Sequence, residues 1–239
     1  MKTIEEQKTN IKVLIGCETS GTVRDAFERK GFDSWSCDLL KADTITNRHI
    51  IGDIRDVMHW SEWDLLYVAH PSCTRMCNSG SRWLIKAPPN KTLQEMWDEL
   101  DEGVALFKEI MVADIPIIAI ENPVMHYHAK SRIWGENWKK ASKNDGTFIQ
   151  QKTVQPYEFA DSLESEDNIK KRTCLWLKNL PPLKATGTLT RETARDDIHK
   201  ASPGKDRWKF RSKFHVGMAE AMAEQWGNAA LTFNSAISH

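Results

Sequence analysis

The sequence predicts a protein of the α/β class, built on a doubly wound, mostly parallel sheet. Short apolar runs alternate with helical patterns through the first half of the chain, and several runs end at a glycine or an acidic residue. Strands buried in a parallel sheet show as near-continuous apolar runs, and their alternation with helices favours such a sheet. At 239 residues the chain is long enough for one substantial core, so we expect a single domain over 1–239.

The elements of the first half follow from these patterns. A β-branched run over 11–15 predicts a strand that ends at Gly16. Apolar residues at helical spacing predict a helix over 22–30, which Gly31 ends. An amphipathic pattern predicts a long helix over 91–112. Further apolar runs predict strands over 32–39, 50–54, 63–69 and 115–120.

The second half is less regular. Residues 130–170 are polar and weakly periodic, and a strand is predicted over 173–177, before Pro181-Pro182. A polar excursion over 184–213 precedes a helix over 216–226. We therefore expect a small irregular excursion near the C-terminus.

Composition excludes several classes of protein. The formal net charge is zero and the pI is near 7.1, so no global field draws the chain to nucleic acid or membrane. No apolar run approaches the roughly 20 residues needed to span a bilayer, and the first ten residues lack the apolar stretch of a signal peptide. Five scattered cysteines are typical of a reducing compartment. We expect a cytoplasmic protein without a membrane partner.

A cofactor loop is predicted between the first strand and the first helix. Gly16 and Gly21 bracket Cys17 and Glu18, and glycine lets backbone N–H groups approach a ligand at a helix N-terminus. Asp38 follows about 20 residues later, where an acid can bind ribose hydroxyls in nucleotide-binding βαβ units. An ordinary strand-to-helix turn is the alternative.

A second acidic residue follows the third predicted strand. Asp53, in Gly52-Asp53-Ile54, is placed to hold an adenine amino group beside the apolar side chain of Ile54. The alternative role for Asp53 is a helix N-cap.

Two residues at strand ends are candidates for catalysis. Cys73 follows the strand over 63–69, and a thiol in such a loop near helix N-termini can have a lowered pKa and act as a nucleophile. Glu121 ends the most apolar strand and can hold or share a proton, next to Asn122 and a proline. The alternatives are a buried inert thiol and a salt-bridged acid. We expect no metal site, because His70, Cys73 and Cys77 lack a fourth ligand nearby.

Two basic segments are candidates for nucleic-acid contact, because cations neutralise phosphates and aromatic rings stack on bases. One contains Arg172, in the cluster over 170–172. The members of the other segment are Lys205, Arg207, Trp208, Lys209, Arg211 and Lys213. For this second segment, the alternative is a solvated charged loop.

In this order the motifs resemble the DNA cytosine-5 methyltransferase family, and a compact phage-type member in particular. The resemblance spans residues 11–230 and rests most on the cysteine and Glu-Asn motifs. The matching segments are the glycine loop over 16–21, Asp38, Gly52-Asp53-Ile54, Pro71-Ser72-Cys73, Glu121-Asn122-Pro123 and Gly227-Asn228-Ala229.

The resemblance implies a Rossmann-like class I methyltransferase fold and S-adenosylmethionine as the cofactor. It implies that Cys73 adds to C6 of cytosine, that Glu121 protonates or holds N3, and that Asn122 helps to fix the loop of Glu121. Asn228 would then brace the cofactor. Ser72 and Glu18 depart from the family pattern, where proline and glycine are expected. Residues 180–213 would be a reduced target-recognition insertion.

The expected activity is therefore S-adenosylmethionine-dependent methylation of cytosine C5 in DNA, in the cytoplasm of a host if a phage encodes the protein. RNA or a free pyrimidine nucleotide stays open as the substrate. A non-catalytic nucleic-acid or nucleotide-binding module of the same fold is the alternative of a different class.

Overall fold

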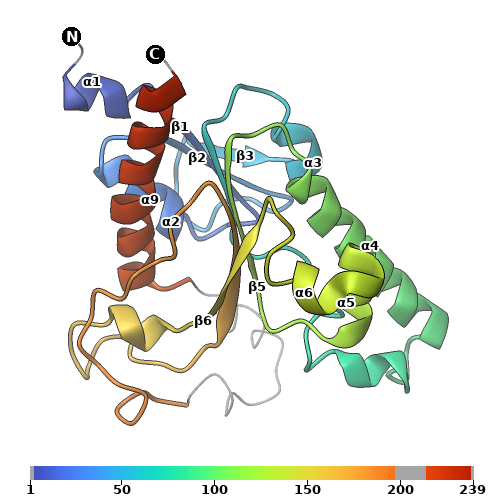
Figure 1. The fold of residues 1–239 in the computed structure, drawn as a ribbon. Coiled ribbons are helices and arrows are strands. Elements are labelled where there is room, and N and C mark those ends of the chain that lie inside the picture. Colours follow the sequence, from blue (N-terminus) through green and yellow to red (C-terminus); the bar gives the residue numbers. More distant parts are fainter. Residues whose placement is uncertain (1–2, 197–213, 238–239) are drawn as a thin grey trace.

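A seven-stranded sheet forms the centre of the computed structural model, which describes residues 3–196 and 214–237 (Figure 1). The strand order is β3-β2-β1-β4-β5-β7-β6, in which β7 alone runs antiparallel to its neighbours. The strands are β1 (Lys12–Gly16), β2 (Asp33–Asp38), β3 (His49–Ile51), β4 (Leu65–Val68), β5 (Ile117–Asn122), β6 (Ile149–Val154) and β7 (Thr173–Lys178). The predicted Rossmann-like, doubly wound, mostly parallel fold is confirmed.

Helices cover both faces of the sheet (Figure 1). One face carries α2 (Thr22–Arg29) and α9 (Val216–Ile237), with α1 (Ile4–Lys8) beside α9. The helices of the other face are α3 (Ile54–Val57), α4 (Leu93–Met111), α5 (Tyr127–Trp134) and α6 (Trp138–Ala141). The short 3₁₀ helices are η1 (Ser81–Leu84), η2 (Gly135–Asn137) and η3 (Pro156–Phe159). Each face of the sheet therefore has its own apolar core.

The strand order changes direction at β1, which has β2 on one side and β4 on the other. The loops after β1 and β4 therefore lead away from each other at the carboxyl edge of the sheet. In open α/β sheets, ligands bind in the crevice that such a reversal leaves.

Three element boundaries differ from the sequence-based expectation. β3 is short, because Asp53 caps α3 and Ile54 is the first residue of that helix. β5 continues through Glu121 and Asn122, which pair with Leu175 and Cys174 of β7. α9 continues to Ile237, so Gly227-Asn228-Ala229 lies within a helix rather than after one.

The sequence-based expectation missed β6, α5 and α6. β6 is an edge strand whose side chains are mostly half-buried or exposed, so its sequence lacks an apolar run. α5 begins after His126, whose ring accepts from the backbone N–H of Ala129. Histidine is not among the usual N-cap residues, so the start of this helix carries no ordinary sequence signal.

The described part of the predicted excursion, over 180–196, is irregular and packs against the rest of the chain. The Gln151 side chain accepts from the backbone N–H of Leu183 and donates to its carbonyl, each at 2.7 Å. Gln225 of α9 binds both backbone groups of Lys184 in the same way. Residues 197–213 lie outside the described residues. No helix in the described ranges is both long and apolar enough to cross a bilayer.

Candidate active site

The loop that carries Cys73 is held against the loop that follows β5. Asn78 donates its backbone N–H to the Val124 carbonyl and His126 donates to that of Met76, both at 3.0 Å. α4 covers the Cys73 loop at Gly103, where an added Cβ would lie 2.8 Å from the carbonyl oxygen of Ser72. Glycine therefore lets the helix approach the loop closely. These contacts fix Cys73 relative to Glu121.

Cys73 is half-buried, and its thiol is not activated in this state. Burial raises the pKa of the Cys73 thiol from 9.0 to about 12, and the negative charge of Glu121 adds to the shift. The lowered pKa expected from the sequence is therefore wrong for the unliganded protein. The influence of Glu121 on this pKa also shows that the thiol and the carboxylate lie within electrostatic range of each other.

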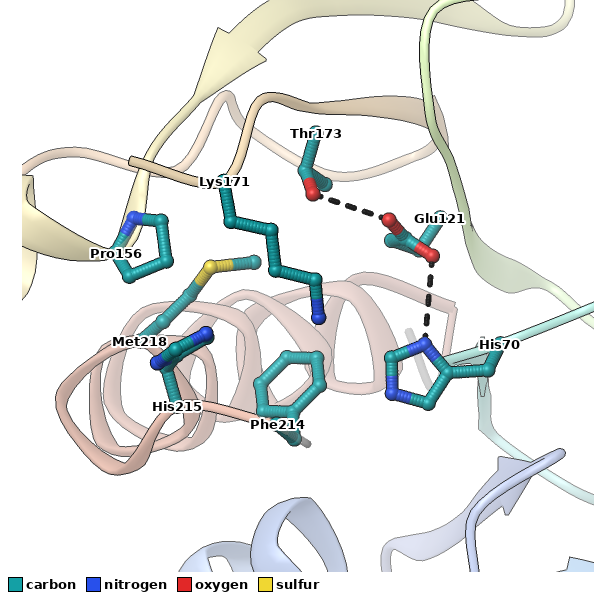
Figure 2. Close-up of a pocket in the computed structure, with 8 residues that line it drawn as sticks. All are labelled: His70, Glu121, Pro156, Lys171, Thr173, Phe214, His215 and Met218. Atoms are coloured by element: carbon teal, nitrogen blue, oxygen red, sulfur yellow. Dashed lines mark hydrogen bonds and ion pairs between the residues drawn. The ribbon is translucent and has the colours of Figure 1, made fainter. Parts of the chain in front are cut away.

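Glu121 is buried, with 4% of its surface exposed, and two side chains bind its carboxylate. Thr173 Oγ1 donates to Oε1 at 3.0 Å, and His70 Nδ1 lies 3.6 Å from Oε2 (Figure 2). Figure 2 shows the Lys171 side chain pointing into the same space, above the ring of Phe214. A small hollow of about 10 Å³ lies among these groups.

His215 and Asp167 form a second polar pair at the edge of this hollow. His215 Nδ1 lies 3.2 Å from Asp167 Oδ1, and the backbone N–H of Gly217 donates to Oδ2 at 2.5 Å. Burial raises the pKa of Asp167, but the hydrogen bonds from His215 and Gly217, together with the charge of His215 and the backbone N–H of Val216, lower it overall. The pair therefore anchors the start of α9 beside the hollow.

A larger cavity of about 270 Å³ lies beside the Glu121 hollow, at the carboxyl ends of β1 to β4. His70 lines both spaces. The other residues that line the larger cavity are Cys17, Cys37, Asp38, Leu39, Gly52, Asp53, Ile54, Arg55, Ser72, Glu102 and Leu106. The structure therefore brings together Cys17, Asp38, Asp53 and Ile54, as the cofactor hypothesis requires.

This lining fits the nucleoside part of a cofactor. Asp38 and Asp53 supply two carboxylates, and Ile54, Leu39 and Leu106 supply apolar surface. Carboxylates can accept from ribose hydroxyls and exocyclic amines, and aliphatic side chains pack on a purine face. The volume lies near the lower end of small-molecule sites.

The glycine loop is built differently from a phosphate-cradling loop. The Glu18 carboxylate is 1% exposed and accepts from the backbone N–H groups of Val23 and Arg24, at the start of α2. Burial raises the pKa of Glu18, and these hydrogen bonds oppose the shift. Glu18 therefore occupies the helix N-terminus itself and does not line the larger cavity.

The two glycines of this loop have separate structural roles. Gly21 is the N-cap of α2 at a φ of 71°, which glycine adopts without strain. Gly16 ends β1 where an added Cβ would lie 2.8 Å from the Ile54 side chain. Neither glycine lines the larger cavity, whereas Cys17 between them does, at a φ of 57°.

Asp53 is the N-cap of α3 and also lines the larger cavity. Its side chain caps α3 by accepting from the backbone N–H of Arg55 at 2.9 Å, and it pairs with the Arg55 guanidinium. The hydrogen bond from the Arg55 side chain is the main cause that lowers the pKa of Asp53. The carboxylate is thus ionised at the cavity wall.

The two predicted asparagines behave differently. Asn122 is fully buried, and within the described residues neither its Oδ1 nor its Nδ2 has a hydrogen-bond partner. Pairing of Glu121 with Leu175 of β7, rather than the Asn122 side chain, holds the backbone of Glu121 in place. Asn228 lies on the exposed side of α9 and donates to Glu224 at 3.2 Å. It does not line the larger cavity, so the structure does not bring Asn228 into the site.

Of the predicted nucleic-acid contacts, the structure places Arg172. It is exposed at the start of β7, between Lys171 and Thr173 of the Glu121 hollow. Lys205, Arg207, Trp208, Lys209, Arg211 and Lys213 lie outside the described residues. Among the residues that are described, no group of three or more His, Cys, Asp or Glu side chains is arranged to hold a metal ion.

Several residues of the site were not predicted from the sequence. His70 was considered only as a metal ligand, and Thr173 only as the start of a strand. Lys171 was noted only as part of a basic cluster. The signal for Thr173 and Lys171 lies in the β5–β7 pairing, which no local pattern reveals. His70 could have been predicted as a site residue from its position in the sequence, between the end of β4 and Cys73.

Comparisons with known proteins give distant structural likeness. No protein-family model matches the chain, and no curated protein sequence matches it. One similar structure is an E. coli prophage-encoded protein assigned as a DNA modification methyltransferase, at 8% identity and a TM-score of 0.40. Another is the Entamoeba histolytica methyltransferase EhMeth, at 11% identity and a TM-score of 0.39.

The matches cover most of this chain but less of the similar structures. They cover 70% of this chain and 46% of the prophage protein, and 81% of this chain and 60% of EhMeth. The chain thus spans less than two thirds of either structure.

Proposed function

We propose that this protein is an S-adenosylmethionine-dependent methyltransferase that acts at C5 of cytosine in DNA through a covalent adduct on Cys73. The observation that carries the proposal is the placement of a thiol and a buried carboxylate within electrostatic range, beside a cavity with two carboxylates. A binding module has no need of this pairing of a thiol with a carboxylate.

The residues divide the chemistry between them. The Cys73 sulfur bonds to C6 of the ring while its thiol proton passes by way of Glu121 to N3. The π bond between C5 and C6 breaks, its electron pair is shared along C4 toward N3, and C5 becomes nucleophilic. S-adenosylmethionine supplies an electrophilic methyl group when it is bound. The C5 proton then leaves to a base, and its electron pair restores the double bond between C5 and C6 as the bond between C6 and sulfur breaks. The N3 proton returns by way of Glu121 to the sulfur, which restores the thiol.

Substrate binding activates the nucleophile in this scheme. Burial is the main cause of the raised pKa of Cys73, and the negative charge of Glu121 adds to it. A cytosine hydrogen-bonded to Glu121 shares that charge, so the pKa of the thiol falls when the base arrives. The thiol is therefore kept protonated until a substrate is present.

The substrate also has to displace a side chain. The hollow at Glu121 has a volume of about 10 Å³, which is too small for a pyrimidine ring. The His70 ring already contacts the Glu121 carboxylate. A base that binds Glu121 therefore takes the place of His70 Nδ1. In duplex DNA that base has to leave the stack to reach the site.

The larger cavity is the proposed cofactor site. Asp38 would bind the ribose hydroxyls, Asp53 the adenine amino group, and Ile54 the purine face. Because Glu18 occupies the N-terminus of α2, the amino-acid end of the cofactor would be bound by other groups of this cavity. We assign residues 180–213 as the reduced target-recognition segment, with Arg172 and the basic residues over 205–213 as its DNA contacts.

A second candidate is methylation of a free pyrimidine nucleotide by the same thiol. The zero net charge of the chain favours a small substrate over a long polyanion. Methyl transfer measured with DNA and with dCMP as alternative acceptors separates the two candidates.

The test is methyl transfer from a tritiated donor to DNA, RNA and dCMP, followed by digestion and nucleoside analysis. The proposal predicts tritium in 5-methyldeoxycytidine from DNA, which is lost in Cys73→Ser and retained in the neighbouring control Cys77→Ser. Tritium on the exocyclic amine of cytosine, or transfer that survives Cys73→Ser, would contradict the covalent mechanism.

A further inference from the structure

The surface of α5 and α6 carries a concentration of positive charge. Residues 126–143 contain five lysines and arginines and one glutamate, a net charge of +4 in a chain whose net charge is zero. Arg132 forms an ion pair with Asp101 of α4, so the lysines carry the remaining positive charge of this surface. We define the cationic–aromatic face as Tyr127, Lys130, Trp138, Lys139, Lys140 and Lys143.

Aromatic rings alternate with ammonium groups on this face. The Nζ atoms of Lys130 and Lys139 lie 5.7 and 5.9 Å from the ring of Trp138. The Tyr127 ring is 5.6 Å from that of Trp138, and Tyr127 is 56% exposed. Exposed rings of this kind offer stacking surfaces for bases, and the adjacent cations suit phosphates.

The lysines also repel one another. Burial lowers the pKa of Lys130, and the nearby charges of Lys152 and Lys143 lower it further, against an opposite effect of Cys174. In the described part of the chain no carboxylate forms an ion pair with Lys130, Lys139, Lys140 or Lys143. A phosphate placed among them would relieve this repulsion.

The face adjoins the loop that carries Cys73. α5 starts directly after the loop that follows Glu121, beside the carboxyl end of β5 (Figure 1). His126, just before α5, donates its backbone N–H to the carbonyl of Met76 in the Cys73 loop. Glu121 itself faces the hollow at the start of α9, on the other side of the sheet from α5. A strand bound on this face would therefore pass over the carboxyl edge of the sheet, beside the Cys73 loop, to reach Glu121.

We propose that the cationic–aromatic face binds the phosphodiester backbone of the DNA substrate, with Tyr127 stacking on a base next to the one that enters the site. The inference rests on the proposed function for its choice of DNA. Lys139, Lys140 and Lys143 contact phosphates, which fixes the DNA without reading its sequence. The face is thus the part of the molecule that compensates for its short target-recognition segment.

The test is DNA binding by fluorescence anisotropy at several salt concentrations, without methyl donor. The variant is the triple substitution K139Q/K140Q/K143Q, at three exposed positions. The matched control is K12Q/K108Q/K184Q, which removes the same charge from exposed lysines elsewhere on the molecule. Both triples are compared on the same single-stranded and duplex oligonucleotides, and circular dichroism checks that each is folded.

The proposal predicts that the α5–α6 triple weakens DNA binding about tenfold or more at 0.1 M salt. It also lowers the slope of log K against log salt by about two to three, because each lost phosphate contact removes about 0.7–0.9. The control triple changes the slope by less than one. Tyr127→Leu weakens binding to single strands and leaves the salt slope unchanged, because stacking releases no counterions.

Equal effects of the two triples would overturn the proposal, because net charge alone would then explain binding. It would also fall if the parent bound DNA no better than polyglutamate of equal charge, or bound no DNA at all. DNA binding that depends on this face without methyl transfer would instead leave the inference standing and remove the proposed function.

Discussion

His70 Nδ1 lies 3.6 Å from Oε2 of Glu121, and the same imidazole lines the larger cavity. Its Nε2 is buried and has no hydrogen-bond partner among the described residues. One side chain therefore joins the carboxylate that would hold the substrate to the space that would hold the methyl donor. Under the proposed function His70 would have two roles: it would contact Glu121 before the substrate arrives and would be a base close to the reacting ring afterwards.

Replacement of this imidazole tests both roles. His70→Asn should lower kcat by about 10²-fold, the lower end of the contribution of a positioned acid or base. Donor affinity should change much less, because His70 is one of many groups that line the larger cavity. The measurement is kcat together with donor Kd from calorimetry. An unchanged kcat would show that His70 is a packing residue.

The hydrogen bond from Thr173 to Glu121 gives a second prediction. Thr173→Val keeps the side-chain shape but removes the Oγ1 donor of the 3.0 Å bond, so the buried carboxylate loses a partner. We expect a loss of about 1–2 kcal/mol in the free energy of unfolding, with a lower methyl-transfer rate. Thr173→Ser, which keeps the hydroxyl, is the matched control. Equal stability of the Val and Ser variants would mean that the bond is not formed.

The raised pKa of Cys73 predicts how its alkylation depends on pH. Only the thiolate reacts with iodoacetamide, and burial and Glu121 raise the pKa to about 12. The alkylation rate at Cys73, followed by peptide mass spectrometry, should therefore rise through pH 9 and show no plateau up to pH 10.5. Glu121→Gln removes the negative charge and should speed the reaction at a given pH. A plateau near pH 9 in the parent would contradict the raised pKa.

The position of Gly227 predicts a change that affects stability but not cofactor binding. An added Cβ at Gly227 would lie 2.4 Å from the Phe32 ring, so Gly227→Ala should destabilise the fold by about 1–3 kcal/mol. Asn228→Ala should be nearly neutral, because Asn228 is exposed and bonded to Glu224. Donor affinity should stay at the parent value in both variants. A large loss of donor affinity in Asn228→Ala would show that Asn228 does belong to the cofactor site.

The sequence predicted the centre of the sheet well and its edge poorly. β1, β4 and β5 are buried on both faces, so their apolar runs stand out from the helices around them. β6 has a neighbour on one side only and carries Gln150, Gln151 and Lys152, so no hydrophobic period marks it. The reversed direction of β7 depends on pairing between distant segments, which local patterns do not encode.

The candidate site was predictable where residues follow strands directly. Asp38, Cys73 and Glu121 were found this way, because parallel strands bring their carboxyl ends to one edge. The role of Glu18 was not, because its carboxylate caps a helix that starts several residues later. Gly227-Asn228-Ala229 matched a motif in sequence, yet α9 continues through it and packs it against Phe32.

The central claim is tested most directly by intact mass analysis after incubation with S-adenosylmethionine and DNA containing 5-fluorocytosine. Fluorine at C5 cannot leave as a proton does, so an enzyme that attacks C6 stays bound to the methylated base. The account predicts a protein–DNA adduct that forms in the parent, is absent in Cys73→Ser and maps to the peptide with Cys73. Methylation of ordinary cytosine DNA at C5, with no adduct on the fluorinated substrate, would contradict it.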